Sequence, residues 1–541
     1  MRKLFVLAGT FLALASTARS QVTAASCSQR DVVNALASVT SDNVTVSIPV
    51  CNVSWGATTA YSKGPANVSA DGHVTYNQNH SIVIQGQGNT TGATSDGLSN
   101  PTGYNDQTRI TDLVNDSSNA TFIINSASGK TFRMTGMSFL YTSSQTTNRN
   151  SGIINILGNS HAFRIDHNHL QAGNCCRLTN YASGNVLGVF DHNFVDIPNG
   201  TNVNLFEVNG ANYGGHGDGN GDYSWADASN FGTGNFMFVE NNTFSAQSGA
   251  TVFDVEQGGR FVFRYNTLIN VRTQTHSLGH GGPTQRDRGP RAFEVYKNVF
   301  MMPAGNYAHL MDLEQGTSLW WGNTFTLSAS GNGFGNFIKS NNRRSSGQTY
   351  THGTPPNGWG YCGTALGPSN WDQNADSSGQ ACLDGIGRGK GNLFTGPFPL
   401  TPSWPSQARD PVYVWANIVT GTGNYWNQVD AATQENRDYF LELPNASEPG
   451  ATFNGTAGIG HGTLTPTTAS AYTGAPNCSS STYPGPGYWQ TSAPGTLWVC
   501  TALNTWSNTY YTAFTYPHPL VNGGAPATQP TTPPGQTGTV H

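Results

Sequence analysis

The stretch FRIDHNHL, from Phe163 to Leu170, is the first copy of a phrase that the chain repeats six times. In each copy, alternating apolar residues lead into an asparagine, and another apolar residue follows. The copies are FRIDHNHL (Phe163 to Leu170), VFDHNFV (Val189 to Val195), MFVENNTF (Met237 to Phe244), FVFRYNTL (Phe261 to Leu268), FEVYKNVF (Phe293 to Phe300) and LWWGNTF (Leu319 to Phe325).

The spacing of the shared asparagine indicates a solenoid. The asparagine falls at positions 168, 193, 242, 266, 298 and 323, so the gaps are 25, 49, 24, 32 and 25 residues. A repeat near 25 residues, with one doubled or loop-bearing interval, is typical of stacked β-coils. We therefore predict an all-β fold, a right-handed parallel β-helix, whose successive coils lie about 4.8 Å apart. The asparagines themselves are interpreted as scaffold that fixes the register of the coils.

Composition agrees with short strands joined by many turns. The 541 residues include 65 glycines, and only 10% are charged, which disfavours helical bundles. The net charge is −5 and no basic stripe occurs, so no nucleic-acid partner is expected. No segment after the N-terminus is apolar enough to predict a membrane span.

The N-terminus predicts secretion. An apolar stretch from Leu4 to Ala15 follows Met-Arg-Lys and ends in small residues, so residues 1–20 are expected to be a signal peptide rather than a buried first helix. Eight cysteines fit an extracellular, oxidising compartment. Three local pairs are disulfide candidates, while the partners of Cys175 and Cys176 stay open: Cys27–Cys51, Cys362–Cys382 and Cys478–Cys500.

The chain divides into a solenoid and a C-terminal part. Residues 21–455 are expected to form the β-helix, which begins with a cap helix from Asp31 to Val39. Long insertions near residues 210–234 and 339–397 interrupt it, and such loops commonly carry binding sites. Residues 456–522 are expected to form an aromatic, disulfide-bearing segment packed on the helix, followed by a disordered Pro/Thr-rich tail at 523–541.

Several pieces of the chain resemble secreted right-handed parallel β-helix repeat proteins of bacteria, in the pectate-lyase-like superfamily. The resemblance spans most of the chain, and it implies the architecture more strongly than an activity. The pieces are Cys27 to the IPVC ending at Cys51, SIVIQGQG (Ser81 to Gly88), the asparagine-bearing coils, RGPRAFEVYKNVF (Arg288 to Phe300), GYWQT (Gly487 to Thr491), and LWVCTALNTW with YYTAFTYPHPL ending at Leu520.

A second strand precedes each asparagine-bearing strand and carries carboxylates. Three copies share a form: LFEVNG (Leu205 to Gly210), VFDVEQG (Val252 to Gly258) and LMDLEQG (Leu310 to Gly316). Because side chains alternate along a strand, the apolar members should point into the core and the acidic members outward. The expected inward residues are Phe206, Val208, Phe253, Val255, Met311 and Leu313.

Aligning four coils by this pattern predicts two polar columns. The first holds Glu207, Asp254, His276 and Asp312; the second holds Asn209, Glu256, Leu278 or His280, and Glu314. Two carboxylates about 5 Å apart repel each other by about 1 kcal/mol even in water, so the columns need a cation, a basic neighbour or a raised pKa. We therefore expect calcium, with Glu207, Asp254, Glu256 and Asp312 as ligands. The alternative is that these are solvated outward residues of ordinary strands.

The loop that follows His276 supplies basic residues beside the predicted acidic column. It reads Gly279-His280-Gly281, then Arg286-Asp-Arg288-Gly-Pro-Arg291, and Arg suits the binding of uronate carboxylates. Arg288 to Arg291 is similar to the Arg-x-Pro-x-x-Arg stretch of pectate lyases, although Arg291 follows Pro290 directly. Ile165-Asp-His167 is similar to their Ile-Asp-His stretch. The resemblance implies an Arg or Lys base and a calcium ion that neutralises the substrate carboxylate. A loop held by salt bridges to Asp287 and Glu294 is the alternative.

Aromatic residues are candidates for sugar-stacking platforms. Trp225 lies in the first insertion, within an acidic Gly-rich stretch that is either a calcium loop or a plain surface loop. Trp320 and Trp321 are equally suited to the core or to a coil corner.

The leading hypothesis is a secreted, monomeric polysaccharide lyase that cleaves a uronate-containing polymer by β-elimination. The predicted catalytic residues are His276, Arg288, Arg291 and Asp254, and the predicted substrate-binding residues are His280, Arg286, Glu314 and Trp225.

Two other functional classes stay open. A glycoside hydrolase of polygalacturonase type is one, because Gly279-His280-Gly281 is similar to its Gly-His-Gly, although the other motifs are missing. An inverting hydrolase needs carboxyls about 6.5–9.5 Å apart, for which Asp254 with Glu256 or with Asp312 is the candidate pair. A non-catalytic glycan-binding or adhesin protein is the other class. We see no flat Thr-x-Thr array in the sequence, which disfavours ice binding.

Overall fold

The computed structural model describes the chain as a set of stacked coils with gaps. The described residues are 20–88, 106–114, 120–140, 152–171, 179–180, 186–197, 204–209, 228–256, 258–275, 290–302, 309–327, 336–340, 385–390, 408–421, 424–428, 433–446, 453–463, 465–466, 478–480, 482–492, 494–508 and 512–523.

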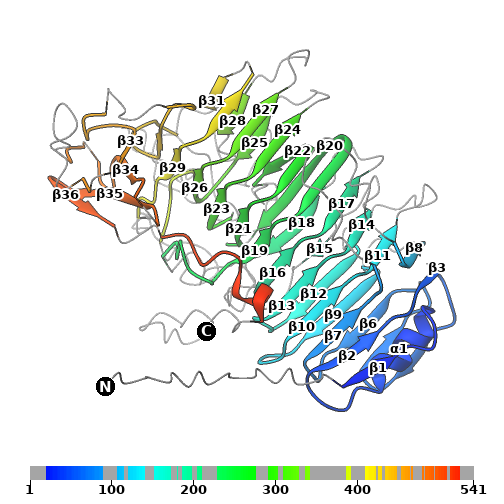
Figure 1. Ribbon diagram of the computed structural model, residues 1–541. Coiled ribbons are helices and arrows are strands. Elements are labelled where there is room, and N and C mark those ends of the chain that lie inside the picture. The colour runs from blue at the N-terminus through cyan, green and yellow to red at the C-terminus, as the bar shows by residue number, and fades with distance from the viewer. Residues whose placement is uncertain are drawn as a thin grey trace, which may run out of the picture.

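The molecule is a parallel β-helix, as predicted, and each regular coil contributes strands to three faces (Figure 1). The first face is a sheet of 12 described strands. They are β1 (Gln21–Thr23), β2 (Val44–Ser47), β7 (Ile82–Gln85), β10 (Phe132–Thr135), β13 (Phe163–Asp166), β16 (Gly188–Asp191), β19 (Met237–Glu240), β21 (Arg260–Arg264), β23 (Ala292–Tyr296), β26 (Thr317–Trp321), β29 (Val412–Trp415) and β32 (Tyr439–Leu441).

The second face follows the first across a tight turn. Its strands are β3 (Cys51–Trp55), β8 (Thr108–Asp112), β11 (Ser138–Leu140), β14 (His169–Gln171), β17 (Phe194–Ile197), β20 (Thr243–Glu256), β22 (Thr267–Gln274), β24 (Val299–Met302), β27 (Thr324–Leu327) and β30 (Ile418–Thr420).

The third face joins the second because the long strands β20 and β22 belong to both. Its other strands are β4 (Tyr61–Lys63), β5 (Ala66–Val68), β6 (Val74–Asn77), β9 (Phe122–Ser126), β12 (Ile154–Gly158), β15 (Thr179–Asn180), β18 (Asn204–Asn209), β25 (His309–Leu313), β28 (Asn336–Ser340) and β31 (Asn424–Gln428).

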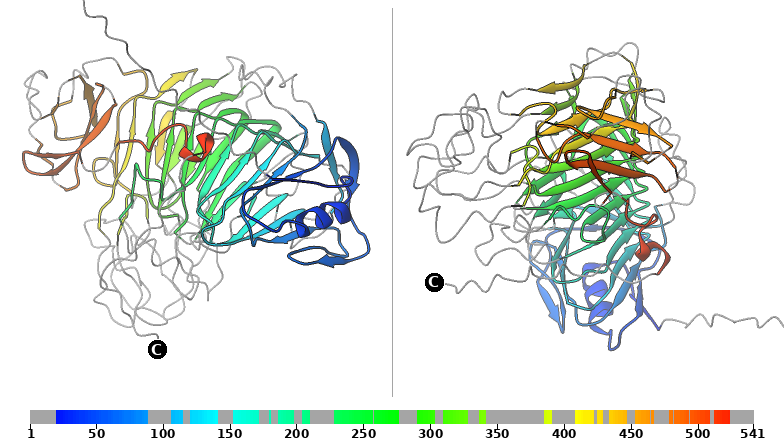
Figure 2. Two further views of the ribbon diagram at one scale, coloured as in Figure 1. Left: turned by 60° about the horizontal axis from the view of Figure 1, so that its bottom comes forward. Right: turned by 90° about the vertical axis from the view of Figure 1, so that its left-hand side faces the viewer.

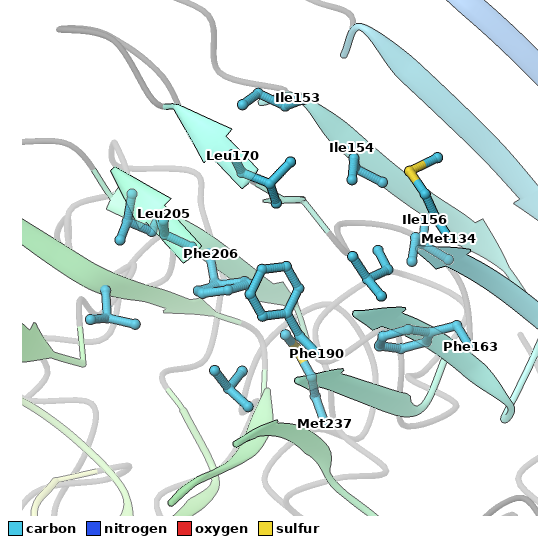
Figure 3. Close-up of a cluster of buried hydrophobic side chains, with 14 of the residues drawn as sticks. Met134, Ile153, Ile154, Ile156, Phe163, Leu170, Phe190, Leu205, Phe206 and Met237 are labelled. Carbon is cyan, nitrogen blue, oxygen red and sulfur yellow. The ribbon is translucent and has the colours of Figure 1, made fainter. Parts of the chain in front are cut away.

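Inward side chains from the three faces fill the solenoid in layers (Figure 3). Phe190 of the first face meets Phe206 of the third edge to face, with ring centroids 4.9 Å apart. One coil on, Phe253 stacks on Phe261 at 4.0 Å. The predicted inward residues of the acidic strands are all fully buried: Phe206, Val208, Phe253, Val255, Met311 and Leu313.

The asparagine column is a continuous hydrogen-bonded ladder, which confirms its predicted role as scaffold. Each Nδ2 donates to the Oδ1 of the asparagine on the next coil at 3.0 to 3.1 Å, from Asn168 through Asn323 to a seventh member, Asn417. The residue before each asparagine is left-handed, with φ between 51° and 61° at His167, His192, Asn241, Tyr265, Lys297, Gly322 and Ala416. Such strain persists only where the surroundings fix it, and the ladder does so.

The N-terminal mouth of the solenoid is covered by α1 (Gln29–Ala37), as predicted to within two residues (Figure 1). Ser28 caps the helix, and its hydroxyl accepts a hydrogen bond from the Asp31 amide at 3.2 Å. Val32, Val33 and Leu36 turn into the core. This burial shields the open end of the stack from water.

The C-terminal part forms a small sheet and then a strap. The sheet comprises β33 (Ile459–Gly462), β34 (Gly487–Gln490), β35 (Thr496–Ala502) and β36 (Thr505–Ser507), and it lies beyond β29 at the far end from α1 (Figures 1 and 2). Ile459 and Leu497 of this sheet pack against Tyr413 and Phe440 of the first face. Residues 512–523 then return along the first face as far as β16, ending in the short helix η3 (Pro519–Asn522). We call residues 512–523 the strap.

Two of the predicted disulfides are present. Cys27 is bonded to Cys51, and Cys478 is bonded to Cys500, which fits an oxidising compartment. The pair Cys362–Cys382, the adjacent Cys175 and Cys176, and the signal peptide up to residue 19 lie outside the described residues. Within the part of the chain that the structure describes, no helix is long and apolar enough to cross a membrane.

Candidate functional site

The predicted acidic column exists as a backbone register on the third face. Glu207 of β18 pairs with Asp254 of β20, and Asn209 pairs with Glu256. The column extends toward the N-terminus, because Asn155 of β12 pairs with Asn180 of β15, which pairs with Glu207. These four strands lie side by side in Figure 1. The side chains of Glu207, Asp254 and Glu256 lie outside what the structure describes, so their chemical roles stay predictions.

The predicted continuation of the column to His276 and Asp312 is wrong at this coil. Asp312 of β25 pairs with Gln274 on one side and with Lys339 of β28 on the other. The strand β22 runs without a break from the second face to the third, and its end, Gln274, takes the position opposite Asp312. This puts His276 two residues beyond the position opposite Asp312, outside the described residues.

Asp312 is held by a cation of the protein itself. Lys339 Nζ lies 3.3 Å from Asp312 Oδ2, and the Asp312 side chain is only 6% exposed. The positive charge of Lys339 neutralises the negative charge of the Asp312 carboxylate. The predicted role of Asp312 as a calcium ligand is therefore not supported.

Glu314 is buried rather than presented to a polymer. It has no exposed surface, and its backbone N–H donates to Thr275 Oγ1 at 3.1 Å. Ile386, within the predicted second insertion, pairs with the nearby Gly316, whose carbonyl accepts from the Gly387 amide at 3.0 Å. The prediction that Glu314 contacts substrate is therefore wrong for this arrangement.

Arg291 is likewise a buried residue and not an accessible base. Its Nη1 and Nη2 each lie 3.2 Å from Asp410 Oδ2, and the Arg291 side chain has no exposed surface. Burial raises the pKa of Asp410, although the Arg291 charge opposes that rise. Asp410 lies 119 residues further along the chain. Of the alternative partners, Glu294 accepts a hydrogen bond from the Gly232 amide, and Asp287 lies outside the described residues.

The remaining predicted site residues lie outside the described residues: His276, His280, Arg286, Arg288 and Trp225. Of the other candidate aromatic platforms, Trp320 is a buried core residue. Trp321 packs between Trp415, at 5.9 Å, and Trp489 of the C-terminal sheet, at 5.3 Å. Neither ring offers an open face for a sugar.

The sequence analysis missed a row of buried ion pairs on the first face. Arg164 Nε and Nη2 donate to the two oxygens of Asp191 at 2.9 and 2.7 Å. Arg264 Nε donates to Glu240 Oε2 at 2.6 Å, and neither of these side chains is exposed. The signal was present in the phrase itself, because Asp191, Glu240 and Arg264 each stand two residues before a ladder asparagine.

The strap covers this charged row. Arg264 donates to the carbonyls of Phe514 and Thr515 at 2.7 and 2.9 Å, and the His518 amide donates to Glu240 Oε1 at 2.7 Å. Burial and the nearby Arg264 and Arg164 lower the pKa of His518 to about 3, so its ring is neutral. The row therefore holds the strap and is not an open site.

The stretch Ile165-Asp-His167, similar to a stretch of pectate lyases, lies at the turn after the first face and not on the third face. His167 Nδ1 lies 2.7 Å from Asp166 Oδ2, and Arg133 binds the same carboxylate through two hydrogen bonds. Burial would raise the pKa of Asp166, but Arg133, His167 and Arg164 lower it to about 2. The His167 and His192 rings stack at 5.2 Å. The geometry is that of a structural ion cluster.

A second polar cluster missed by the sequence analysis lies on the second face. His169 Nδ1 lies 2.9 Å from Asp106 Oδ1, and its Nε2 lies 3.9 Å from Asp196 Oδ2. Burial would lower the pKa of His169, but the two carboxylates raise it. The cluster links β14 to β17 and to the residue that leads into β8.

A calcium ion fits only part of the predicted ligand set. No group of three or more acidic, histidine or cysteine side chains gathers among the residues whose side chains are described. Glu207 and Asp254 remain suitable, because their backbones lie on adjacent coils and carboxylate oxygens are the ligands that calcium prefers.

Comparison of the chain with protein-family models, with curated proteins and with solved structures gives no match. The function must therefore be argued from the residues and their geometry.

Proposed function

We propose that this protein is a secreted, carbohydrate-active β-helix enzyme that cleaves a uronate-containing polysaccharide by β-elimination on its third face. The observation that carries the proposal is the register of Asn155, Asn180, Glu207 and Asp254 on four successive coils. The fold of the pectate-lyase-like superfamily, which the sequence resembles, supports it by analogy only.

The column has the dimensions of a polymer site. Four coils span about 14 Å along the solenoid axis, at about 4.8 Å per coil. The backbone register holds Asn155 and Asn180 at one end and Glu207 and Asp254 at the other. Polar groups in a straight line on a rigid sheet suit an extended chain, because little order has to be created on binding.

The adjacent carboxylates explain why a uronate is the proposed substrate. Glu207 and Asp254 repel each other at coil spacing, so a calcium ion between them lowers the energy of the site. When bound, calcium would also neutralise the carboxylate of a uronate and so acidify its α C–H. A neutral sugar would gain nothing from that charge.

The proposed reaction breaks one C–H and one C–O bond and needs no redox partner. A base removes the proton α to the substrate carboxylate, the electron pair forms the C=C bond, and the glycosidic oxygen leaves with a proton. Arg288 and His276 are the proposed bases, since the chain enters their loop directly after Thr275, at the edge of the third face. Arg291 and Asp312 have no role here, because both are held in ion pairs.

The test is a panel of acidic polysaccharides incubated with the purified protein, with calcium or with a chelator. We expect ultraviolet absorbance from an unsaturated product only with calcium, and its loss in Glu207→Gln and Asp254→Asn. Asp71→Asn is the matched control, because Asp71 is an exposed carboxylate outside the column. New reducing ends without that absorbance would identify a hydrolase instead. Polymer binding without any cleavage would identify a binding protein, and failure to bind any of the polymers would refute the proposal.

A further inference from the structure

The second face carries a strip of uncharged side chains along its C-terminal half. The strip has two columns in backbone register over five coils, on β20, β22, β24, β27 and β30. One column is Thr243, Thr267, Val299, Thr324 and Ile418, and the other is Ser245, Ile269, Met301, Thr326 and Thr420. We call these ten residues the uncharged strip.

The strip faces away from the core. The residues between its two columns point inward and are buried: Phe244, Leu268, Phe300 and Phe325. Val299 is 37% exposed and Ile418 is 53% exposed, while Thr267 is only 8% exposed. Thr326 and Thr420 are also exposed, and the other five members are half-buried. None of the ten carries a charge or an aromatic ring. The uncharged, non-aromatic composition ends one coil earlier, where the same two columns hold Phe194 and Asp196.

The asparagine ladder makes the strip regular. Each member of the first column is the residue directly after a ladder asparagine, and the ladder hydrogen bonds fix the position of every coil. All five members of that column are β-branched, so the χ1 angle of each side chain is restricted. The result is an array of hydroxyl and methyl groups repeating at about 4.8 Å along the axis and about 7 Å across it.

The size and chemistry of the strip exclude several kinds of partner. At roughly 20 Å by 7 Å it is far smaller than the ~800 Å² that each side of a stable protein complex usually buries. It lacks the aromatic faces on which sugar rings stack. With no charge, it offers nothing to a polyanion or to anionic lipid.

We propose that the uncharged strip binds the surface of ice. Six of its ten side chains carry hydroxyls that hydrogen-bond to water, and their methyl groups, with those of the aliphatic members, order the water between them. Because the array is periodic along the solenoid axis, the water that it orders is periodic too. A charged side chain within the strip would instead hold water in a shell around itself. The sequence hid this array because only one of its five coils, Thr324-Phe325-Thr326, carries Thr-x-Thr, while the others mix Thr with Ser, Val, Ile and Met.

The test is slow growth of an ice hemisphere from a solution of the full-length protein. We expect wild-type protein to enter the ice and to shape ice crystals under the microscope, whereas Thr326→Lys and Thr420→Lys are excluded. Thr505→Lys, an equally exposed threonine of the C-terminal sheet, should behave as wild type. Circular dichroism melts check that each variant is folded.

Three results would overturn the proposal. The first is exclusion of the wild-type protein from ice. The second is equal ice entry by Thr505→Lys and the two strip variants. The third is strip-dependent self-association or binding to microcrystalline cellulose without ice entry, which would assign the strip to a second copy or to a solid polysaccharide. None of these outcomes depends on the lyase activity, which we propose for another face.

Discussion

At the residue scale, the ladder asparagines show how one side chain can specify a fold. Asn266 donates through Nδ2 to the carbonyls of Val239 and Arg264 and to Asn298, while its Oδ1 accepts from the amide and side chain of Asn242. No other residue type offers donors and acceptors in this arrangement at this size. The sequence could predict this role because the same residue returns at every coil.

The ladder predicts a large cost for a single substitution. Asn266→Ala leaves buried groups of Asn242, Val239 and Arg264 without their partner, at about 1–3 kcal/mol for each unsatisfied group. We expect the free energy of unfolding to fall by at least about 3 kcal/mol, measured by chemical denaturation. Asn445→Ala is the control. The exposed Asn445 side chain accepts from the Val419 amide and donates to the Val419 carbonyl, and water can replace both bonds, so we expect a loss of less than about 1 kcal/mol. Equal losses would mean that the ladder is not cooperative.

Glu294 predicts a pH dependence of stability. This fully buried carboxyl, beside a small pocket below Thr512 and Trp489, accepts one hydrogen bond from the Gly232 amide at 2.7 Å. Burial raises the pKa of Glu294 to about 7, and the Gly232 bond and Arg264 only partly oppose it. The folded state therefore favours the neutral acid, so stability falls as pH rises from about 4.5 to about 7 and is level above that.

Replacement of Glu294 by Gln tests this dependence. The variant keeps an acceptor for Gly232 but cannot ionise, so we expect it to be more stable than wild type at pH 8 by up to about 3 kcal/mol and equal at pH 4. Thermal melts across this pH range measure the difference. A constant difference at all pH values would show that Glu294 does not titrate in this window.

Residue-scale reasoning failed where the partner lay far away in the chain. Arg291 pairs with Asp410 and Arg264 contacts the carbonyl of Phe514, 119 and 250 residues away. The residues around each arginine do not predict such a distant partner. A buried arginine and a catalytic arginine therefore look alike in sequence.

At the element scale, the strap is the part of the structure whose position depends least on neighbouring residues in the sequence. Its contacts are backbone carbonyls on buried arginines, together with Tyr516, which stacks on Tyr265 at 3.7 Å and donates to Asn241. The sequence indicated a packed C-terminal segment but not its path. The sequence also did not predict that β22 runs unbroken between two faces, and for this reason the predicted column was wrong at that coil.

Removal of the strap should expose the buried ion pairs that it covers. A chain ending at Asn508 is expected to be less stable than one ending at Gly523 by at least about 3 kcal/mol, because the Glu240 and Arg264 pair loses three hydrogen bonds. Comparative thermal melts measure this, and a synthetic peptide of residues 512–523 should restore part of the loss. Identical melting of the two chains would mean that the strap contributes nothing to stability.

At the scale of the whole molecule, the three faces of the solenoid differ in what they carry. The first face is covered by the strap and the C-terminal sheet, the second carries the uncharged strip, and the third carries the polar column. The repeat in the sequence was enough to predict the stacked coils, because the same asparagine-bearing pattern recurs from one coil to the next. It was not enough to predict the site, because the loops and long strands between repeats decide which residues of neighbouring coils meet.

The central claim is that Glu207 and Asp254 form a calcium-dependent centre for a uronate polymer. The most direct measurement is anomalous diffraction from crystals soaked with calcium, for the wild-type protein and for Asp254→Asn. We predict an anomalous peak between the carboxylates of Glu207 and Asp254 in the wild type and none at that position in the variant. A wild-type map with no peak at this position would contradict the claim.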